Sequence, residues 1–291
     1  MAELLLGKEV ASSMEEDLKK RITALAGNGI TPKLVIVRCG ENQSDLAYER
    51  GILKRAETVG IAVEKVVFPE TVSKEELTAT IETVNADEKI HGCLIFRPLP
   101  SHLRAEQEEI CNRLAPEKDV DGITDLSYAG VFTGKKLGFA PCTPEACIAM
   151  LDHYGVELKG KNVVLIGRSL VVGKPLAMLL LARHATVTVC HTRTVDLPSI
   201  ARGADILITA AGALGSLTKE YVKPGQIVID VSVNWDENKP NARGGRGAIA
   251  GDAVFDEVEP VVSAITPVPG GVGTVTTMVL MAHVTEAAER K

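Results

Sequence analysis

Apolar and polar positions in the first part of the chain repeat with the alternating periods of strands and helices. A capping box starts one of the helices, because Ser73 is followed three residues later by Glu76, which marks Ser73 as the N-cap. Regular alternation of strand and helix predicts a parallel sheet covered on both faces, and thus a first α/β domain. The predicted strands are residues 33–39, 61–68 and 91–96, and the predicted helices are residues 15–26, 45–59 and 73–85.

The rest of the chain predicts a second domain of the same class. Thr143 is the expected N-cap of a helix that runs to His153, with Pro144 at its first helical position. A strand, a helix and a strand then form a βαβ unit, whose crossover should be right-handed. The predicted elements are strands at 163–166, 185–190, 204–210 and 226–233, helices at 175–183 and 274–289, a polar surface loop at 234–247 and a rigid turn at 265–273.

The turn inside the βαβ unit, residues 167–173, lies where a dinucleotide-binding fold places its pyrophosphate. Gly167 allows a tight exit from the strand, and the free N–H groups at the start of the next helix attract an anion. The usual pattern G-x-G-x-x-G would place glycine where Ser169 stands, so the turn alone is also compatible with an ordinary strand-to-helix connection.

The end of the second strand of this unit distinguishes between cofactors. An NAD site usually carries Asp or Glu there, to hold the ribose 2′-hydroxyl group. Here the strand ends in His191-Thr192-Arg193-Thr194, which contains no acid. Arg193 and Arg168 would suit a 2′-phosphate, which favours NADP, although both could instead be solvated surface arginines.

Composition narrows the class of protein. With 291 residues, of which 45% are hydrophobic, the chain is long enough for about two domains. A net charge of −6 and an aromatic content of 3% argue against a nucleic-acid or membrane-surface protein. The six cysteines show no C-x-x-C spacing and suggest reduced thiols of a cytoplasmic protein; no metal site, signal peptide or membrane span is expected.

Six motifs, in order along nearly the whole chain, resemble the methylenetetrahydrofolate dehydrogenase/methenyltetrahydrofolate cyclohydrolase family. The longest is TPVPGGVGTVT at residues 266–276, close to that family's TPVPGGVGPMT. The others are Pro98-Leu99-Pro100, KDVDG at 118–122, PCTP at 141–144, GRSxxVGKP at 167–175 and HTRT at 191–194, with Asp230-Val231 in support.

The resemblance implies two α/β domains, the second a Rossmann-type NADP-binding domain, with a folate cleft between them. Residues 1–141, completed by the closing helix 272–291, would form the catalytic domain, and residues 142–271 the NADP-binding domain. The resemblance also implies a homodimer formed through the NADP-binding domain.

The same resemblance assigns residues to the expected site. Tyr48 would lie against the folate ring and Asp121 would hydrogen-bond the pterin, although Asp121 alone also fits a turn-capping role. The remaining residues implied are Pro269, Gly270 and Gly271 along the folate cleft, and Gly167, Arg168, Ser169, Thr192 and Val233 against the cofactor.

Two departures from the family pattern affect the expected chemistry. The family has lysine four residues after its tyrosine, where this chain has Ile52, and glutamine before its L-P-L-P, where this chain has Phe96. Asp45 also replaces a serine upstream of the tyrosine. Lys54 is about 200° around the helix from Ile52, so it should point to solvent.

Hydride transfer needs positioning only, whereas addition of water to the methenyl group needs a placed acid or base, and Ile52 and Phe96 supply neither. The sequence therefore predicts an NADP-dependent methylenetetrahydrofolate dehydrogenase with weak or absent cyclohydrolase activity. Three alternatives remain open: a fully bifunctional enzyme that uses water or Lys54, an NADP dehydrogenase for another substrate, and a non-catalytic folate- or NADP-binding protein.

Overall fold

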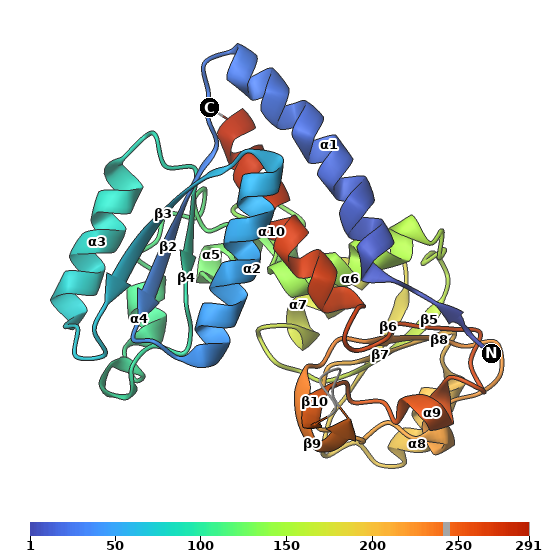
Figure 1. Cartoon of the computed structure of the whole chain (residues 1–291). Coiled ribbons are helices and arrows are strands. Elements are labelled where there is room, and N and C mark those ends of the chain that lie inside the picture. Colours follow the sequence, from blue (N-terminus) through green and yellow to red (C-terminus); the bar gives the residue numbers. More distant parts are fainter. Residues whose placement is uncertain (241–244, 291) are drawn as a thin grey trace. The chain divides into compact units, whose positions relative to one another are not determined.

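The computed structural model describes residues 1–240 and 245–290, and the chain forms two compact units, each built on its own parallel sheet (Figure 1). The six-stranded unit contains residues 1–11 and 143–276, and the three-stranded unit contains residues 12–142 and the chain from Thr277 onward. Both sheets are parallel and both are combined with helices, so the fold is α/β as predicted.

The sheet of the three-stranded unit has the order β3-β2-β4. Its central strand carries five consecutive buried residues, because it is covered on both faces. One face packs against the buried side of α3, and Figure 1 shows α2 on the opposite side of the sheet from α3. The elements are β2 (Lys33–Cys39), β3 (Ala62–Phe68), β4 (Gly92–Ile95), α2 (Gln43–Val59) and α3 (Lys74–Ala86), all close to their predicted positions. Ser73 caps α3 in a complete capping box, as predicted.

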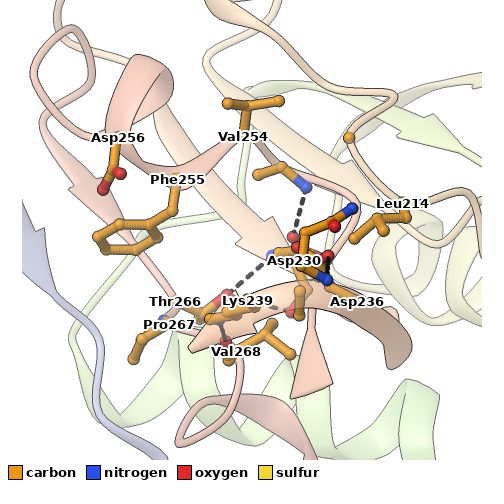
Figure 2. Close-up of a pocket in the computed structure, with 15 residues that line it drawn as sticks. Leu214, Asp230, Asp236, Lys239, Val254, Phe255, Asp256, Thr266, Pro267 and Val268 are labelled. Carbon is orange, nitrogen blue, oxygen red and sulfur yellow. Dashed lines mark hydrogen bonds between the residues drawn. The ribbon is translucent and has the colours of Figure 1, made fainter. Parts of the chain in front are cut away.

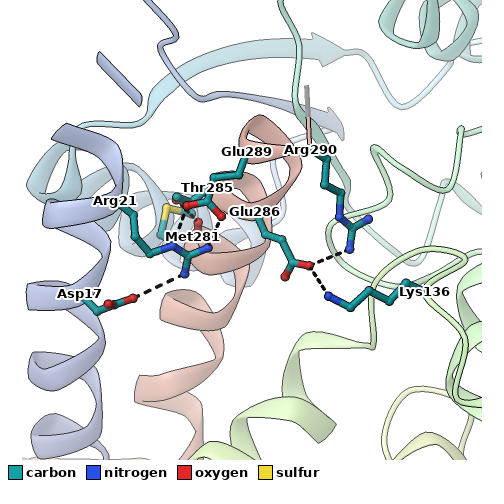
Figure 3. A network of polar contacts seen from close by, with 8 residues as sticks. All are labelled: Asp17, Arg21, Lys136, Met281, Thr285, Glu286, Glu289 and Arg290. Atoms are coloured by element: carbon teal, nitrogen blue, oxygen red, sulfur yellow. Dashed lines mark hydrogen bonds and ion pairs between the residues drawn. The ribbon is translucent and has the colours of Figure 1, made fainter. Parts of the chain in front are cut away.

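The last helix, α10 (Val272–Glu289), joins the three-stranded unit through charged side chains as well as through its buried face. Arg21 on α1 (Gly7–Gly27) donates two hydrogen bonds, of 2.8 and 2.7 Å, to the carboxylate of Glu289 (Figure 3). Glu286, one turn earlier, pairs with both Lys136 and Arg290. These ion pairs fix the helix end to two segments that lie far from it in sequence.

The sheet of the six-stranded unit has the order β1-β11-β8-β7-β5-β6. The predicted βαβ unit is present, with Ile166 at the end of one strand level with Cys190 at the end of the next. The βαβ unit consists of β5 (Asn162–Ile166), α7 (Gly173–Ala182) and β6 (Thr186–Cys190). The other strands of the sheet are β1 (Glu3–Leu4), β7 (Ile206–Thr209), β8 (Ile227–Asp230) and β11 (Ala264–Ile265).

Short helices fill the connections, and none of them was predicted. Most span one to two turns, which is too short for a clear helical period. They are η1 (Ser101–Leu103), α4 (Gln107–Cys111), α5 (Asp125–Thr133), α8 (Leu197–Gly203), η2 (Lys219–Tyr221) and α9 (Phe255–Val258). Across the part of the chain that the structure describes, no helix is long and apolar enough to cross a membrane.

Three local predictions differ from the structure. The polar segment 234–247 is not a plain loop, because β9 (Asn234–Pro240) and β10 (Arg246–Ala250) pair as an antiparallel hairpin; residues 241–244 lie outside the described residues. Thr143 is not an N-cap, since α6 (Cys142–His153) already begins at Cys142. Pro144 is therefore the third helical residue and not the first, and it is tolerated there because the backbone N–H groups of the first turn have no intrahelical partner.

The first eleven residues also lie elsewhere than expected. The resemblance implies that they belong to the catalytic domain, but Glu3 and Leu4 pair in parallel with Ala264 and Ile265 of the six-stranded sheet. Gly7 then begins α1 against Gly271, where a Cβ atom would lie 2.1 Å from the Gly271 carbonyl oxygen. Backbone pairing and this close approach hold the segment on the six-stranded unit.

Candidate active site

The motif at residues 118–122 is a turn whose first two charged side chains serve the fold. Lys118 is buried, and its ammonium group donates to three backbone carbonyl groups of Val84, Asn85 and Asp87. The carboxylate of Asp119 is fully buried and accepts from the backbone N–H groups of the two residues that follow the motif and from two hydroxyl groups. Asp119 therefore caps the turn, and the second aspartate of the motif is left for another task.

That second aspartate, Asp121, faces other side chains. Its Oδ2 lies 3.7 Å from the Arg97 guanidinium, and 21% of its side chain is exposed. Burial raises the pKa of Asp121 to about 6, and the Arg97 charge opposes this rise. The carboxyl group is thus held close to its titration point near neutral pH, which is typical of functional sites.

Tyr48 projects from α2 toward the same place. Desolvation raises the pKa of its phenol well above the ordinary value, and the charge of Asp121 adds to the rise. The ring of Tyr48 meets the ring of Phe96 edge to face, with centroids 5.9 Å apart. Ile52, one turn after Tyr48, is fully buried, whereas Lys54 is exposed as its helical position predicts. Apolar side chains thus occupy both positions where the family pattern has lysine and glutamine.

The sequence did not single out Arg97 and Tyr128 as site residues, but the structure brings them to Asp121. Arg97 directly follows Phe96 at the end of β4, and Tyr128 lies on α5. Desolvation raises the pKa of the Tyr128 phenol, and the nearby Arg97 guanidinium opposes the rise. The signal for Arg97 was its place in the proline-rich motif, where the family pattern has leucine.

In the six-stranded unit, the turn after β5 has the close packing of a nucleotide-binding turn. Gly167 has φ +132°, and a Cβ atom there would lie 2.4 Å from the Ala210 carbonyl oxygen. A Cβ atom on Gly173 would lie 2.3 Å from the Gly167 carbonyl oxygen, so the start of α7 approaches the turn as only glycine permits. The hydroxyl oxygen of Ser169 accepts from the backbone N–H of Val172 at 3.1 Å and thus orders the turn.

The turn after β6 lies beside it, because β5 and β6 are neighbours whose ends are level. The turn is closed by the Thr194 N–H, which donates to the His191 carbonyl at 2.8 Å, and by the His191 N–H, which donates to the Thr194 hydroxyl at 2.9 Å. Thr192 and Arg193 at its tip are exposed, as are Arg168 and Ser169 of the neighbouring turn. The structure therefore brings these four predicted cofactor residues to one edge of the sheet.

The remaining predicted residues of this unit share a cavity of about 240 Å³. Val233, whose side chain is 63% exposed, lines it together with Pro269, Gly270 and Gly271. Gly270 has φ +109°, a conformation that favours glycine, and a Cβ atom on Gly271 would lie 2.7 Å from the Pro267 carbonyl oxygen. Glycines at both positions therefore keep the backbone of this wall accessible.

Asp230, at the end of β8, lines both this cavity and a larger one of about 490 Å³, which Figure 2 shows. Its carboxylate accepts from the backbone N–H groups of Ser232, Asp252 and Ala253 at 3.2, 3.2 and 2.8 Å. Burial raises the pKa of Asp230 to about 6, while these bonds oppose the rise. Because its lone pairs are used by the backbone, Asp230 fixes the loops around both cavities.

Known proteins match this chain over nearly its whole length. The profile of the tetrahydrofolate dehydrogenase/cyclohydrolase catalytic domain matches residues 5–121, and that of the family's NAD(P)-binding domain matches residues 141–291. A relative from Clostridium botulinum, the bifunctional protein FolD, is 47% identical over 291 residues, which is 100% of this chain and 99% of the relative.

Solved structures agree with the sequence relatives. The bifunctional FolD enzyme of Campylobacter jejuni is 36% identical and superposes with a TM-score of 0.92, covering 100% of this chain and 99% of that chain. The Trypanosoma brucei dehydrogenase-cyclohydrolase, solved with NADP and an inhibitor, is 32% identical with a TM-score of 0.91 over 99% and 98% of the two chains. The chain therefore belongs to the tetrahydrofolate dehydrogenase/cyclohydrolase family.

Proposed function

We propose that this protein oxidises 5,10-methylenetetrahydrofolate to 5,10-methenyltetrahydrofolate with NADP and lacks an effective cyclohydrolase. The observation that carries the proposal is the environment of Tyr48. Asp121 is near its hydroxyl group, the buried ring of Phe96 packs against its ring, and the buried side chain of Ile52 lies one helical turn later. This site offers groups that bind a pterin but no lysine or glutamine to activate water.

In this proposal Asp121 accepts hydrogen bonds from the pterin and Tyr48 packs against the folate ring. Pro269, Gly270 and Gly271 contribute accessible backbone to the substrate site. These three residues share one cavity within the six-stranded unit, which supports a role in positioning, the main requirement of hydride transfer.

The cofactor site fits NADP because the turn after β5 has no room for side chains at Gly167 and Gly173, and exposed arginines flank it. Backbone N–H groups at the start of α7 would bind the pyrophosphate, and Arg168 and Arg193 the 2′-phosphate. NADP supplies the hydride acceptor when bound. The NADP complex of the Trypanosoma brucei relative supports this cofactor.

The two activities of the family place different demands on these residues. Loss of a hydride from the methylene carbon is supported by the lone pairs of the two folate nitrogens, so no side chain must move a proton. Addition of water and opening of the ring require proton transfer at a placed group, which typically accelerates a reaction about 10²–10⁴-fold. Ile52 and Phe96 cannot donate, accept or bind a proton through their side chains.

A bifunctional enzyme is the second candidate, and it is favoured by the names of the relatives from Clostridium botulinum and Campylobacter jejuni. Both candidates should reduce NADP, so hydrolysis of methenyltetrahydrofolate is the measurement that separates them. Purified protein should reduce NADP to NADPH when given methylenetetrahydrofolate. It should not increase the rate at which added methenyltetrahydrofolate is hydrolysed above the rate in buffer alone. Enzyme-dependent hydrolysis that survives Lys54→Ala would favour the bifunctional candidate and show that other groups activate water.

We further propose a cytoplasmic homodimer that forms through the six-stranded unit. The six free cysteines, five of them buried, support a reducing compartment. Exposed apolar side chains of this unit, among them Val195 at 86% and Trp235 at 63% exposure, support a contact surface there.

A further inference from the structure

Arg97 has a defined position beside the pterin-binding carboxylate. Its neighbours Phe96 and Leu99 are buried, with 8% and 1% exposure, so the backbone on both sides of Arg97 is anchored in the core. Its guanidinium lies 3.7 Å from Asp121 Oδ2, and 25% of its side chain is exposed. An anchored backbone and a partly buried side chain hold this charge in place, unlike the charge of a free surface arginine.

Most other groups that face Asp121 oppose its ionised form or are neutral. Burial and the carboxylate of Asp119 on the same turn raise the pKa of Asp121, whereas Arg97 is the strongest influence in the opposite direction. The Cys142 thiol and the His283 imidazole also favour the ionised form, but more weakly. The titratable groups that face Asp121 are Arg97 after β4, Asp119 on its own turn, Tyr48 on α2, Cys111 on α4, Tyr128 on α5, Cys142 at the start of α6 and His283 on α10.

The protonation state of Asp121 decides what it can bind. An ionised carboxylate accepts hydrogen bonds at both oxygens and suits the adjacent N–H groups of a 2-amino-4-oxopteridine ring. A protonated carboxyl group presents one O–H donor, which would face a donor of the ring. Binding of the pterin therefore requires that Asp121 remain ionised at the pH of the reaction.

We propose that Arg97 is a positioning residue that keeps Asp121 ionised and oriented for the pterin, a role that rests on the proposed function. The separation of 3.7 Å is longer than a hydrogen bond, so the charge acts on the carboxylate while leaving its lone pairs to the ligand. A guanidinium does not release its proton in proteins, so Arg97 supports binding without replacing the missing acid–base group. The site thus has a cation, Arg97, that supports substrate binding, but no lysine at position 52 that could serve the cyclohydrolase reaction.

The direct test is the titration of Asp121 itself. The carboxyl carbon resonance of Asp121, assigned by its loss in Asp121→Asn, should titrate about one to two pH units higher in Arg97→Leu and in Arg97→Gln. Arg97→Lys keeps the charge, so the pKa of Asp121 should stay close to that of the unmodified protein. An unchanged pKa in the neutral variants would overturn the proposal, because a merely structural arginine would not shift this titration.

The matched control is Arg55→Leu. Arg55 pairs with Glu15 at 3.5 Å, with 30% and 23% exposure, which is close to the geometry of the Arg97 pair. Its loss should leave the titration of Asp121 in place. A shift in this variant equal to that of Arg97→Leu would overturn the assignment to Arg97.

Kinetics give the functional readout. The KM for methylenetetrahydrofolate should rise about two- to tenfold at neutral pH in Arg97→Leu. As the pH rises and Asp121 becomes ionised in both proteins, the KM of the variant should approach that of the unmodified protein. The KM for NADP should not change. A KM ratio that is independent of pH would overturn the proposal. If the unmodified protein forms no NADPH from methylenetetrahydrofolate, the proposed function fails, and the titration still reports whether Arg97 controls Asp121.

Discussion

Replacing Arg193 by alanine should separate the two nicotinamide cofactors. The hydrogen bonds of the turn after β6 come from main-chain groups and from the side chains of His191 and Thr194, and the Arg193 N–H donates to His191 Nδ1 at 3.1 Å. The Arg193 side chain is exposed, and among the described residues it makes no ion pair. Truncation should therefore remove a charge from the proposed 2′-phosphate site and leave the turn intact.

The expected magnitude follows from the exposure of this side chain. A hydrogen bond to a charged group contributes about 1.5–3 kcal/mol, whereas a fully exposed ion pair contributes about 0.2–1 kcal/mol. For an exposed guanidinium that becomes partly covered by the cofactor we take about 1.5–2 kcal/mol, which corresponds to roughly 10- to 30-fold in affinity. NAD has no 2′-phosphate, so its affinity should change less than about twofold.

The assay compares the KM of both cofactors at saturating methylenetetrahydrofolate, with Arg202→Ala as control. Arg202 is an exposed arginine of α8 in the same unit and donates to the Glu220 carbonyl, so its loss should affect neither cofactor. The NADP effect should also shrink as salt is added, since exposed charges are screened. Equal loss with NADP and NAD would refute the assignment of Arg193 to the 2′-phosphate.

Three further predictions concern the turn, the carboxylate and the assembly. Gly173→Ala should weaken NADP binding by about 5- to 150-fold, because overpacking typically costs about 1–3 kcal/mol, whereas Gly203→Ala, which has no neighbour within 4 Å, should not; equal binding by both variants would contradict the close packing at Gly173. Asp121 is ordinarily ionised above 3.8 but titrates at about 6 in the fold, so the folded state retains a proton that the unfolded state has lost. The free energy of unfolding, measured by denaturation from about pH 4 to 6, should therefore increase with pH in Asp121→Asn relative to the unmodified protein. A difference between the two proteins that stays constant with pH would contradict the raised pKa. Light scattering at micromolar concentration should give the mass of a dimer, and a monomer would contradict the proposed assembly.

The sequence predicted the parts of the fold that have a clear period. The strand Lys33–Cys39 and the capped helix Lys74–Ala86 follow directly from apolar periodicity and a capping box. The hairpin of β9 and β10 was missed because its strands are polar. It is held by backbone pairing and by Trp235, whose ring lies where a Cβ atom on Gly247 would come within 2.6 Å. Backbone pairing of this kind leaves no apolar period in the sequence.

The candidate site was predictable only where a motif carried it. Glycine spacing identified Gly167 and the turn, and the resemblance supplied Tyr48 and Asp121. Neither predicted that Asp119 would cap the motif turn, or that Arg97 would lie beside Asp121. The Asp119 bonds are local to its own turn, whereas the contact of Arg97 with Asp121 joins the end of β4 to a turn more than twenty residues later and so depends on the packed domain.

The central claim is that hydride transfer proceeds here without hydrolysis of its product. The most direct measurement follows NADPH and methenyltetrahydrofolate together in one reaction of the unmodified protein with methylenetetrahydrofolate and NADP, with the folates separated by chromatography. Methenyltetrahydrofolate should accumulate in step with NADPH and then decay at the rate seen in buffer. Formation of 10-formyltetrahydrofolate in proportion to enzyme concentration, with little methenyltetrahydrofolate present, would contradict the claim.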